Sequence, residues 1–420
     1  MMPASRERHV LQPFAWRNER REYDLAMFAK LFSRRKAVSL IAGLAGLGLV
    51  AACGPMPTGP GTTGTANTAG NGEKVVVALL VPAGSGNSSD DFIAQNLENA
   101  ARLAASDLNG VEIDLRVYPT AGNPTRAAEA ATKAVAEGAG IILGPVYAEE
   151  ANAAGVAVAG AGVNVLAFSN NPTIAGDNVF VLGPTFRNTA DRLVRYGLRN
   201  GVNNYMIVHG DDLQGQIGRD AIASAVQANG GTLAGVQSYP LSQAGIVNAA
   251  PSIASAINAA NAGAVFMTAG VNADLPILAT ALPENGVSNT DVRFIGLTRW
   301  NAVPQALTLP GLQGGLFALP DQQMAAQFDS RYSAAYGSAA HPLASLAYDG
   351  IAAIGALTAR GQSALDRRAL TAPQGFQGTS GIFRLLNDGT NERGLAVAEI
   401  RNGQVVILSP APSAFGGAGS

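Results

Sequence analysis

The sequence predicts an α/β fold with parallel sheets in two lobes, and three observations support this prediction. From Val75 onward, short apolar runs alternate with Ala-rich stretches of helical period, the pattern of repeated βα units. The 420 residues include 50 Gly, many at the expected ends of helices. The alternation starts again after "VFVLGPTFRN" at 179–188. Two similar halves in tandem suit a chain of this length.

The first half contains expected strands and helices in strict alternation. "VVVALLVP" (Val75–Pro82) is a continuous apolar run, as in a strand buried on both faces. "PTRAAEAATKAVAEG" opens with Pro and closes with Gly, as helices do. The expected strands are 75–82, 111–118, 139–145 and 163–169, and the helices are 90–110, 124–138 and 148–162.

The second half repeats this pattern and ends in hairpins. Helices are expected at 189–201, 215–231 and 247–263, and strands at 203–210, 232–240, 264–270 and 291–297, with no helix assigned between the last two. Helices at 324–337 and 341–361 follow, and then short strands within 381–408. Asn387-Asp388-Gly389 and Asn402-Gly403 are the expected turns.

Composition excludes several functions. The chain has one Cys and three scattered His, so it holds no internal disulfide and no metal-ligand spacing. Nine of its 28 basic residues and four of its 30 acidic residues precede Cys53, which leaves an acidic remainder that argues against a nucleic-acid partner. "GSGNSS" after the first strand lacks the third Gly of a dinucleotide loop. We expect no enzyme, catalytic residue, metal or cofactor.

Residues 1–52 read as an export signal, with Met27 as the expected true start. Arg34, Arg35 and Lys36 precede fourteen uncharged residues and the small pair before Cys53, an apolar run too short to span a membrane. "LVAAC" resembles the lipobox at which bacteria attach diacylglycerol to Cys53, and the alternative is cleavage elsewhere with Cys53 incidental. Residues 53–73 then form a charge-free tether. By resemblance, the lack of Asp after Cys53 is compatible with the outer membrane.

Three polar loops follow strands of the first half, where open α/β sheets bind ligands. They are "PAGSGNSSDD", "GPVYAEE" and "FSNNP", and each leads into a helix. His209 ends a strand before Asp211-Asp212, and it reads either as a residue facing the crevice or, more simply, as a turn residue with one satisfied ring nitrogen.

The chain resembles type I periplasmic solute-binding proteins of the leucine/isoleucine/valine-binding group. The resemblance spans about 74–408 and depends on "VALLVPAGSG", "PTRAAEAATKAV", "GIILGPVYAEEANAAGVAVAGAGVNVLAFSNNP", "HGDDLQGQIGRD" and "SLAYDGIAAIGAL". It implies two Rossmann-like lobes joined by three crossovers that close on a ligand. The expected boundaries are 74–186 with 318–358 for the first lobe, 187–317 with 359–410 for the second, and 411–420 for a tail.

The resemblance also implies a ligand site. In the first lobe Ser85 and Tyr147 lie in polar loops, and Ser169 and Asn170 match a loop that holds a ligand carboxylate. In the second lobe Asp212 and Gln214 occupy the aspartate-then-glycine loop of the family. Asn272 or Asp274 is the nearest candidate for the residue that binds the ammonium group of an amino acid. Tyr147 replaces a small hydroxyl residue and Gln214 an aromatic one.

The resemblance leaves two functions open, and the second of them fits these departures. The first is a lipid-anchored protein that delivers a small polar solute, such as an amino acid, to an ABC permease. The second comes from the penicillin-binding-protein activator lipoproteins, which the anchor, the tether and "GTSGIFRLLNDGTNERGLAVAEIRNGQVV" also resemble. Such a protein docks on a peptidoglycan synthase of the cell envelope and transports nothing.

Overall fold

The structure is a computed structural model that describes residues 74–361 and 365–416. Its first lobe is a five-stranded parallel sheet in the order β2-β1-β3-β4-β5. The strands are β1 (Lys74–Val81), β2 (Glu112–Pro119), β3 (Ile141–Leu143), β4 (Asn164–Ala167) and β5 (Val179–Val181). All five strands are parallel, so the loops that follow β1, β3 and β4 lie along one edge of the sheet.

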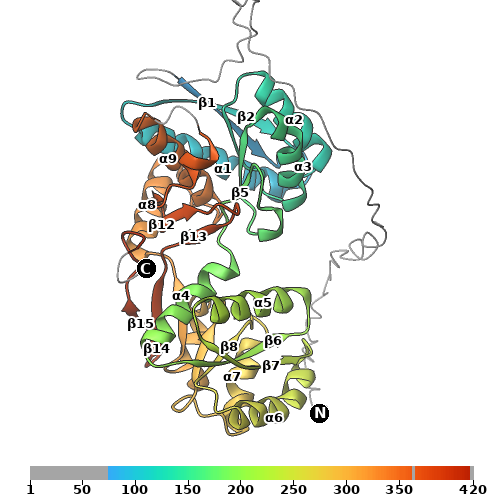
Figure 1. The fold of residues 1–420 in the computed structure, drawn as a ribbon, viewed down its shortest axis with the longest axis vertical. Coiled ribbons are helices and arrows are strands. Elements are labelled where there is room, and N and C mark those ends of the chain that lie inside the picture. The colour runs from blue at the N-terminus through green and yellow to red at the C-terminus, as the bar shows by residue number, and fades with distance from the viewer. Residues whose placement is uncertain (1–73, 362–364, 417–420) are drawn as a thin grey trace, which may run out of the picture. The chain divides into compact units, whose positions relative to one another are not determined.

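Helices cover both faces of this sheet (Figure 1). Ala78 and Leu80 of β1 pack with α2 (Pro124–Ala136) and α3 (Ala148–Val158). Val77 and Leu79 pack on the other face with α1 (Ser88–Asp107), α8 (Gln322–Tyr336) and α9 (Ala344–Ala359). Since side chains alternate along a strand, burial of both sets explains the continuous apolar run of β1.

The second lobe contains a seven-stranded sheet in the order β15-β14-β10-β9-β8-β6-β7. Strands β6 to β10 run parallel, and β14 pairs antiparallel with β10. One face packs against α4 and α5, the other against α6 and α7. The bounds are β6 (Asn204–Gly210), β7 (Thr232–Tyr239), β8 (Ala264–Met267), β9 (Arg293–Gly296), β10 (Leu316–Leu319), β14 (Ala396–Arg401), β15 (Gln404–Ser409), α4 (Phe186–Arg199), α5 (Leu213–Ala228), α6 (Gln243–Ala259) and α7 (Leu275–Glu284).

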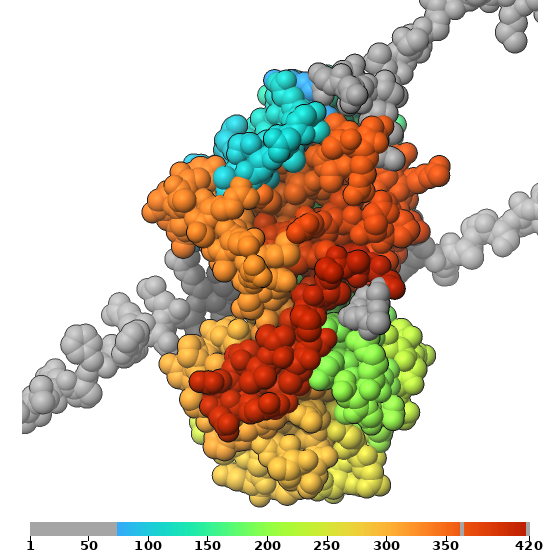
Figure 2. All heavy atoms as spheres, turned by 90° about the vertical axis from the view of Figure 1, so that its left-hand side faces the viewer, coloured from blue at the N-terminus to red at the C-terminus, as the bar shows by residue number. Residues whose placement is uncertain are grey.

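The C-terminal segment contributes to both lobes. The hairpin β14–β15 lies on the surface of the second lobe, in dark red beside green and orange segments in Figure 2. In contrast, β11 (Phe376–Gly378), β12 (Gly381–Leu385) and β13 (Asn391–Arg393) form a separate three-stranded sheet. Phe376 and Phe383 of that sheet belong to the core of the first lobe. Residues 369–385 therefore pack with the first lobe, whereas the expected boundary gave 359–410 to the second.

Helix α7 and strand β10 are elements that the sequence reading did not assign. Two prolines, Pro276 and Pro283, mask the helical pattern of α7. Pro276 stands in the first turn, where its missing N–H leaves no bond unmade, and Pro283 stands in the last turn. The short apolar run of β10 is fully buried between β9 and β14.

A buried polar network ties the chain segments that pass between the lobes. Asn391 Nδ2 donates to the carbonyls of Val181 and Gly183, at 2.8 and 2.9 Å. The Asn391 carbonyl in turn accepts from Asn188 Nδ2 at 2.8 Å. Arg192 on α4 donates to the Leu395 carbonyl at 2.6 Å. These bonds join the β5–α4 passage, which adjoins the expected boundary at 186/187, to the β13–β14 passage.

Candidate functional site

Three polar side chains meet at the carboxyl ends of β1 and β3. Ser85 follows β1, and Tyr147 follows β3 as the N-cap of α3. The Ser85 hydroxyl donates to Asp90 Oδ2 at 2.7 Å, and the Tyr147 hydroxyl donates to Asp90 Oδ1 at 2.5 Å. Asp90 is 7% exposed in the first turn of α1. Two of the predicted residues are thus joined through a carboxylate that the sequence reading missed.

No local sequence feature singles out Asp90. It belongs to "SSDD" at a helix start, where acidic residues are common because they complement the helix dipole. Its role becomes visible only when Tyr147, 57 residues later, lies against it.

A second buried carboxyl group, that of Glu150 in the first turn of α3, lies near Asp90 of α1. Glu150 is 1% exposed, and neither carboxylate oxygen makes a hydrogen bond of normal geometry. Burial raises the pKa of Glu150, and the charge of Asp90 adds to that rise, while the Thr120 hydroxyl and the Tyr147 N–H oppose it. This edge of the first lobe therefore holds the buried Asp90 carboxylate beside a glutamate whose neutral form burial favours.

Ser169 and Asn170 follow β4 on the same edge of the sheet. Ser169 is buried, its Oγ accepts the Asn171 N–H at 3.1 Å, and its carbonyl accepts the Gly183 N–H at 3.1 Å. Asn170 is exposed. Ser169 thus holds the shape of the loop, and Asn170 presents its amide to solvent.

The second-lobe residues lie after β6 and β8, which are neighbours in the sheet. Asp212 is the N-cap of α5 and accepts the Gly215 N–H at 2.9 Å. Gln214 is exposed on the first turn of α5, and Asn272 is exposed on the loop after β8. Asp212 therefore has a capping role, while the two amides remain open to a ligand.

Asp274 is occupied by protein groups. One of its oxygens accepts the Gly270 N–H at 2.7 Å, and the other accepts the hydroxyl of the buried Tyr239. Burial, followed by the bond to Asp274, raises the pKa of Tyr239. Asp274 thus fixes the loop after β8. Of the two residues expected near the ammonium group of a ligand, Asn272 is the exposed one.

His209 is the second-last residue of strand β6, and one of its ring nitrogens has a hydrogen-bond partner. It is buried, and its Nδ1 lies 2.6 Å from the Gly210 carbonyl oxygen. The satisfied ring nitrogen agrees with the simpler of the two interpretations, but the residue lies in a strand and not in a turn.

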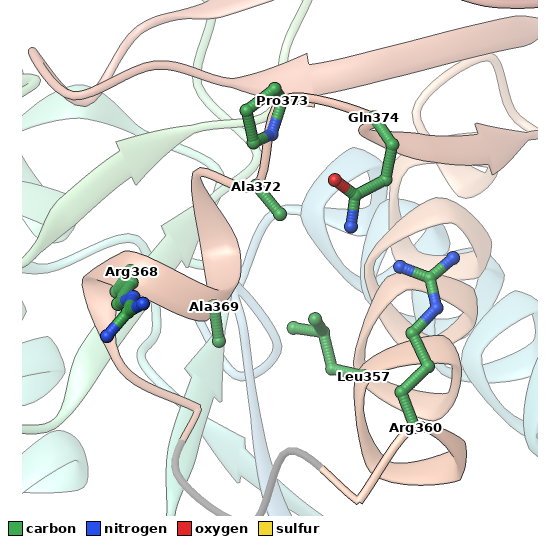
Figure 3. A pocket seen from close by; sticks show the side chains of 7 residues that line it. All are labelled: Leu357, Arg360, Arg368, Ala369, Ala372, Pro373 and Gln374. Atoms are coloured by element: carbon green, nitrogen blue, oxygen red, sulfur yellow. The ribbon is translucent and has the colours of Figure 1, made fainter.

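Two hollows in the first lobe lie apart from these loops. One, of about 250 Å³, is lined by residues of α9, of α10 (Arg367–Leu370) and of the segment that follows α10. Figure 3 shows Arg360 and Gln374 on one side of it, with Leu357 between them and Ala369. The other, of about 320 Å³, lies against α8, α9 and β11. Neither contains a predicted site residue.

Two sequence expectations concern features that the structure tests only in part. Within 74–361 and 365–416, no group of three or more His, Cys, Asp or Glu is placed to hold a metal ion. In the same residues no helix is long and apolar enough to cross a membrane. Cys53 and the tether lie outside the described residues.

The fold and the strand-end loops are those of a protein that binds a solute between α/β lobes. A family model described as periplasmic binding protein matches residues 74–404. The chain therefore belongs to the periplasmic binding protein family, and membership in this family of solute-binding proteins confirms the expectation of a non-enzymatic protein.

Solved structures with the same fold have low sequence identity to this chain. One is a putative branched-chain amino acid ABC transporter protein from Rhodospirillum rubrum, at 17% identity and a TM-score of 0.66, covering 80% of this chain and 100% of that chain. Another is an ABC transporter substrate-binding protein from Desulfitobacterium hafniense in complex with Leu, at 18% identity and a TM-score of 0.54, with coverages of 80% and 100%. A third is a solute-binding protein from Rhodopseudomonas palustris BisB5 in complex with 3,4-dihydroxy benzoic acid, at 18% identity and a TM-score of 0.50, with coverages of 81% and 98%. A search of curated proteins found no significant match.

Proposed function

We propose that this protein binds a small organic acid, either an amino acid or an aromatic acid, and delivers it to an ABC permease. The observation that carries the proposal is the family match over 74–404, together with open amides at the strand ends of both sheets. Asn170 belongs to the first lobe, and Gln214 and Asn272 belong to the second. The solved relatives from D. hafniense and R. palustris hold leucine and a dihydroxybenzoate, which sets the range of solutes to test.

Calorimetric titration and thermal melting of the full chain test this proposal with leucine, other amino acids and hydroxybenzoates. A solute present at about 100 times its Kd stabilises the folded state by about 2.7 kcal/mol, which gives a clear rise in Tm. Small-angle scattering is expected to show closure of the lobes with the same solute.

A pair of matched variants links binding to the strand-end loops. Asn170→Ala is expected to weaken binding about fivefold to tenfold, since a hydrogen bond contributes about 1 kcal/mol. Asn109→Ala, at an exposed turn beyond α1, is expected to leave the affinity unchanged. Equal affinities of the two variants, or flat titrations with every solute, would count against the proposal.

The alternative role, as activator of a peptidoglycan synthase, is supported by the resemblance of the expected anchor, the tether and the segment 378–406 to that branch. It stays a prediction, and flat titrations together with crosslinking to a penicillin-binding protein in intact cells would support it.

The proposal includes anchoring of the chain through a lipid on Cys53, in the cell envelope and with the outer membrane as its expected place. The sequence around Cys53 supports this, because small residues and an apolar run precede the thiol and a charge-free segment follows it. Cys53→Ser is expected to move the protein from the membrane fraction to the soluble fraction. Met56→Ser, three residues further on, is the matched control, and equal membrane retention of both variants would refute the anchor.

A further inference from the structure

The strand-end edge of the second lobe holds a guanidinium without a partner. Arg299 follows β9 by three residues and is exposed. Among the described residues its guanidinium takes part in no hydrogen bond or ion pair, and its backbone carbonyl accepts the Ala302 N–H, whereas the Arg293 guanidinium at the start of the same strand donates to the Gly314 carbonyl at 2.6 Å. An unpaired cation held on a short loop is available to an anion from outside the chain.

The loop that carries Arg299 is fixed on both sides. Thr298 Oγ1 donates to the Ala269 carbonyl at 2.9 Å, which joins this loop to the one after β8. The next residue, Trp300, is fully buried. The backbone at Arg299 is thus preorganised beside the loop of Asn272.

One helix of the same lobe, α5, carries exposed aliphatic side chains. Leu213 and Ile217, one turn apart at the start of α5, are 59% and 45% exposed. Helix α5 packs on the ends of β8 and β9, since a Cβ at Gly218 would lie 2.8 Å from Thr268 and 2.9 Å from Leu297. Exposed aliphatic side chains on this helix give an apolar ligand a surface to cover.

The first lobe offers a weaker place for the same anion. The buried carboxylate of Asp90 lies on its α3 side, where Tyr147 donates to it. Its cation at the strand ends, Arg126, is exposed on α2 after the outermost strand β2, two strands from β3. On the second lobe Asp211 is an exposed carboxylate after β6, so a ligand that also carries an ammonium group has a partner there.

We propose that Arg299 binds the carboxylate of the solute, so that the second lobe and not the first recognises the anionic group. This inference rests on the proposed function and reverses the arrangement that the family resemblance implies, in which Ser169 and Asn170 hold the carboxylate. Arg299 then determines specificity for acids over their neutral analogues.

The test uses matched probes and three charge-removing variants of the full chain. The probes are leucine, 4-methylpentanoate, its amide and 3-methylbutylamine, with 3,4-dihydroxybenzoate and its amide as the aromatic pair. Arg299→Gln is expected to weaken binding of the carboxylates roughly 10- to 100-fold, because a charge-assisted hydrogen bond is lost, and to leave the amides unchanged.

Two controls remove the same charge elsewhere. Arg126→Gln alters the cation at the strand ends of the first lobe. Arg401→Gln alters an exposed residue paired with Glu399 on β14, which lies at the opposite edge of the second sheet because β14 runs antiparallel to β10. Both are expected to bind the carboxylates as the wild type does.

The possible results distinguish failure of the Arg299 inference from failure of the proposed function. Loss of carboxylate binding in Arg126→Gln instead of Arg299→Gln, or equal wild-type affinity for acid and amide, overturns the inference and leaves the proposed function intact. If Arg299→Gln weakens carboxylate binding but the wild-type lobes do not close on the bound carboxylate, the inference is supported and the transport role is contradicted. A wild type that binds no probe at millimolar concentration overturns both.

Discussion

Replacing Asp349 with alanine is expected to lower the free energy of unfolding by about 3–5 kcal/mol, because it leaves a buried guanidinium without its counter-ion. Asp349 on α9 is 1% exposed, and its Oδ2 lies 3.4 Å from Arg393 Nη1. The other oxygen accepts the Thr379 N–H at 2.6 Å. Arg393 also donates to the Leu182 carbonyl and lies over the Phe383 ring, so it cannot turn to solvent without breaking these contacts.

Urea unfolding followed by circular dichroism measures this loss. Glu98→Ala, which removes one partner of the exposed Arg102–Glu98 pair, is the matched control and is expected to cost about 0.5 kcal/mol or less. The double variant Asp349→Ala with Arg393→Met is expected to recover part of the loss, since no charge is then left buried. A loss in Asp349→Ala no larger than that in Glu98→Ala would contradict the assignment.

The same carboxyl gives the stability a pH dependence of defined sign. Burial raises the pKa of Asp349 above 3.8, and Arg393 and Thr379 oppose that rise without cancelling it. A carboxyl with a raised pKa contributes stability that is complete below about 3.8 and is lost as the pH rises through the higher value. The variant Asp349→Asn lacks this titrating group. Its unfolding free energy is therefore expected to change less than that of the wild type as the pH rises from about 3.8 through the raised pKa of Asp349.

Local sequence pattern was sufficient for most of the fold. The apolar run of β1 predicts a strand buried on both faces, and its residues do alternate between two cores. Asn402-Gly403 predicts a tight hairpin turn, and both residues have positive φ, of 52° and 73°, between β14 and β15. Such elements are set by neighbours in sequence, which is why they can be read before the structure is known.

The site was less predictable because its contacts join distant segments. Ser85 and Tyr147 were selected for the loops they occupy, yet what joins them is Asp90. Arg299 had no feature that separates it from the other arginines of the sequence. Only the structure shows that others in its lobe, such as Arg192, are bonded while Arg299 is free among the described residues.

The packing of the C-terminal segment also depends on residues that are distant in sequence. Asn391 and Arg393 bond to Val181, Gly183 and Leu182, more than 200 residues earlier, and no local pattern records such a bond. Residues 376–393 therefore looked like a continuation of the second lobe until the packing of their side chains was visible.

Trp300→Ala is expected to cost about 3–5 kcal/mol of unfolding free energy, since it empties the largest fully buried side chain of the described residues. The indole fills space left by two glycines: a Cβ at Gly296 would lie 2.2 Å from its Nε1, and a Cβ at Gly315 would lie 2.5 Å from Cζ3. Its ring centroid is 5.9 Å from that of Phe317 on β10. The ring thus holds the segment after β9 against β10.

Trp300→Phe separates packing from hydrogen bonding at this position. The indole N–H is buried without a partner, so phenylalanine removes an unsatisfied donor and leaves a smaller cavity. We expect Trp300→Ala to lose the most stability and Trp300→Phe to lose less. The control Phe92→Ala, which truncates a side chain that is 55% exposed, is expected to lose the least. Urea unfolding ranks the three, and a loss in Trp300→Ala equal to that in Phe92→Ala would contradict the packing argument.

Trp300 also connects stability to recognition, because it adjoins Arg299. If the buried indole positions the loop, Trp300→Ala weakens carboxylate binding at temperatures where the protein is still folded, while its affinity for the matched amide changes little. Trp300→Phe, which keeps an aromatic ring under the loop, retains carboxylate binding. Calorimetry of both variants with 4-methylpentanoate and its amide measures this difference. Equal carboxylate affinity in Trp300→Ala and wild type would show that Arg299 is positioned by Thr298 and its bond to Ala269 alone.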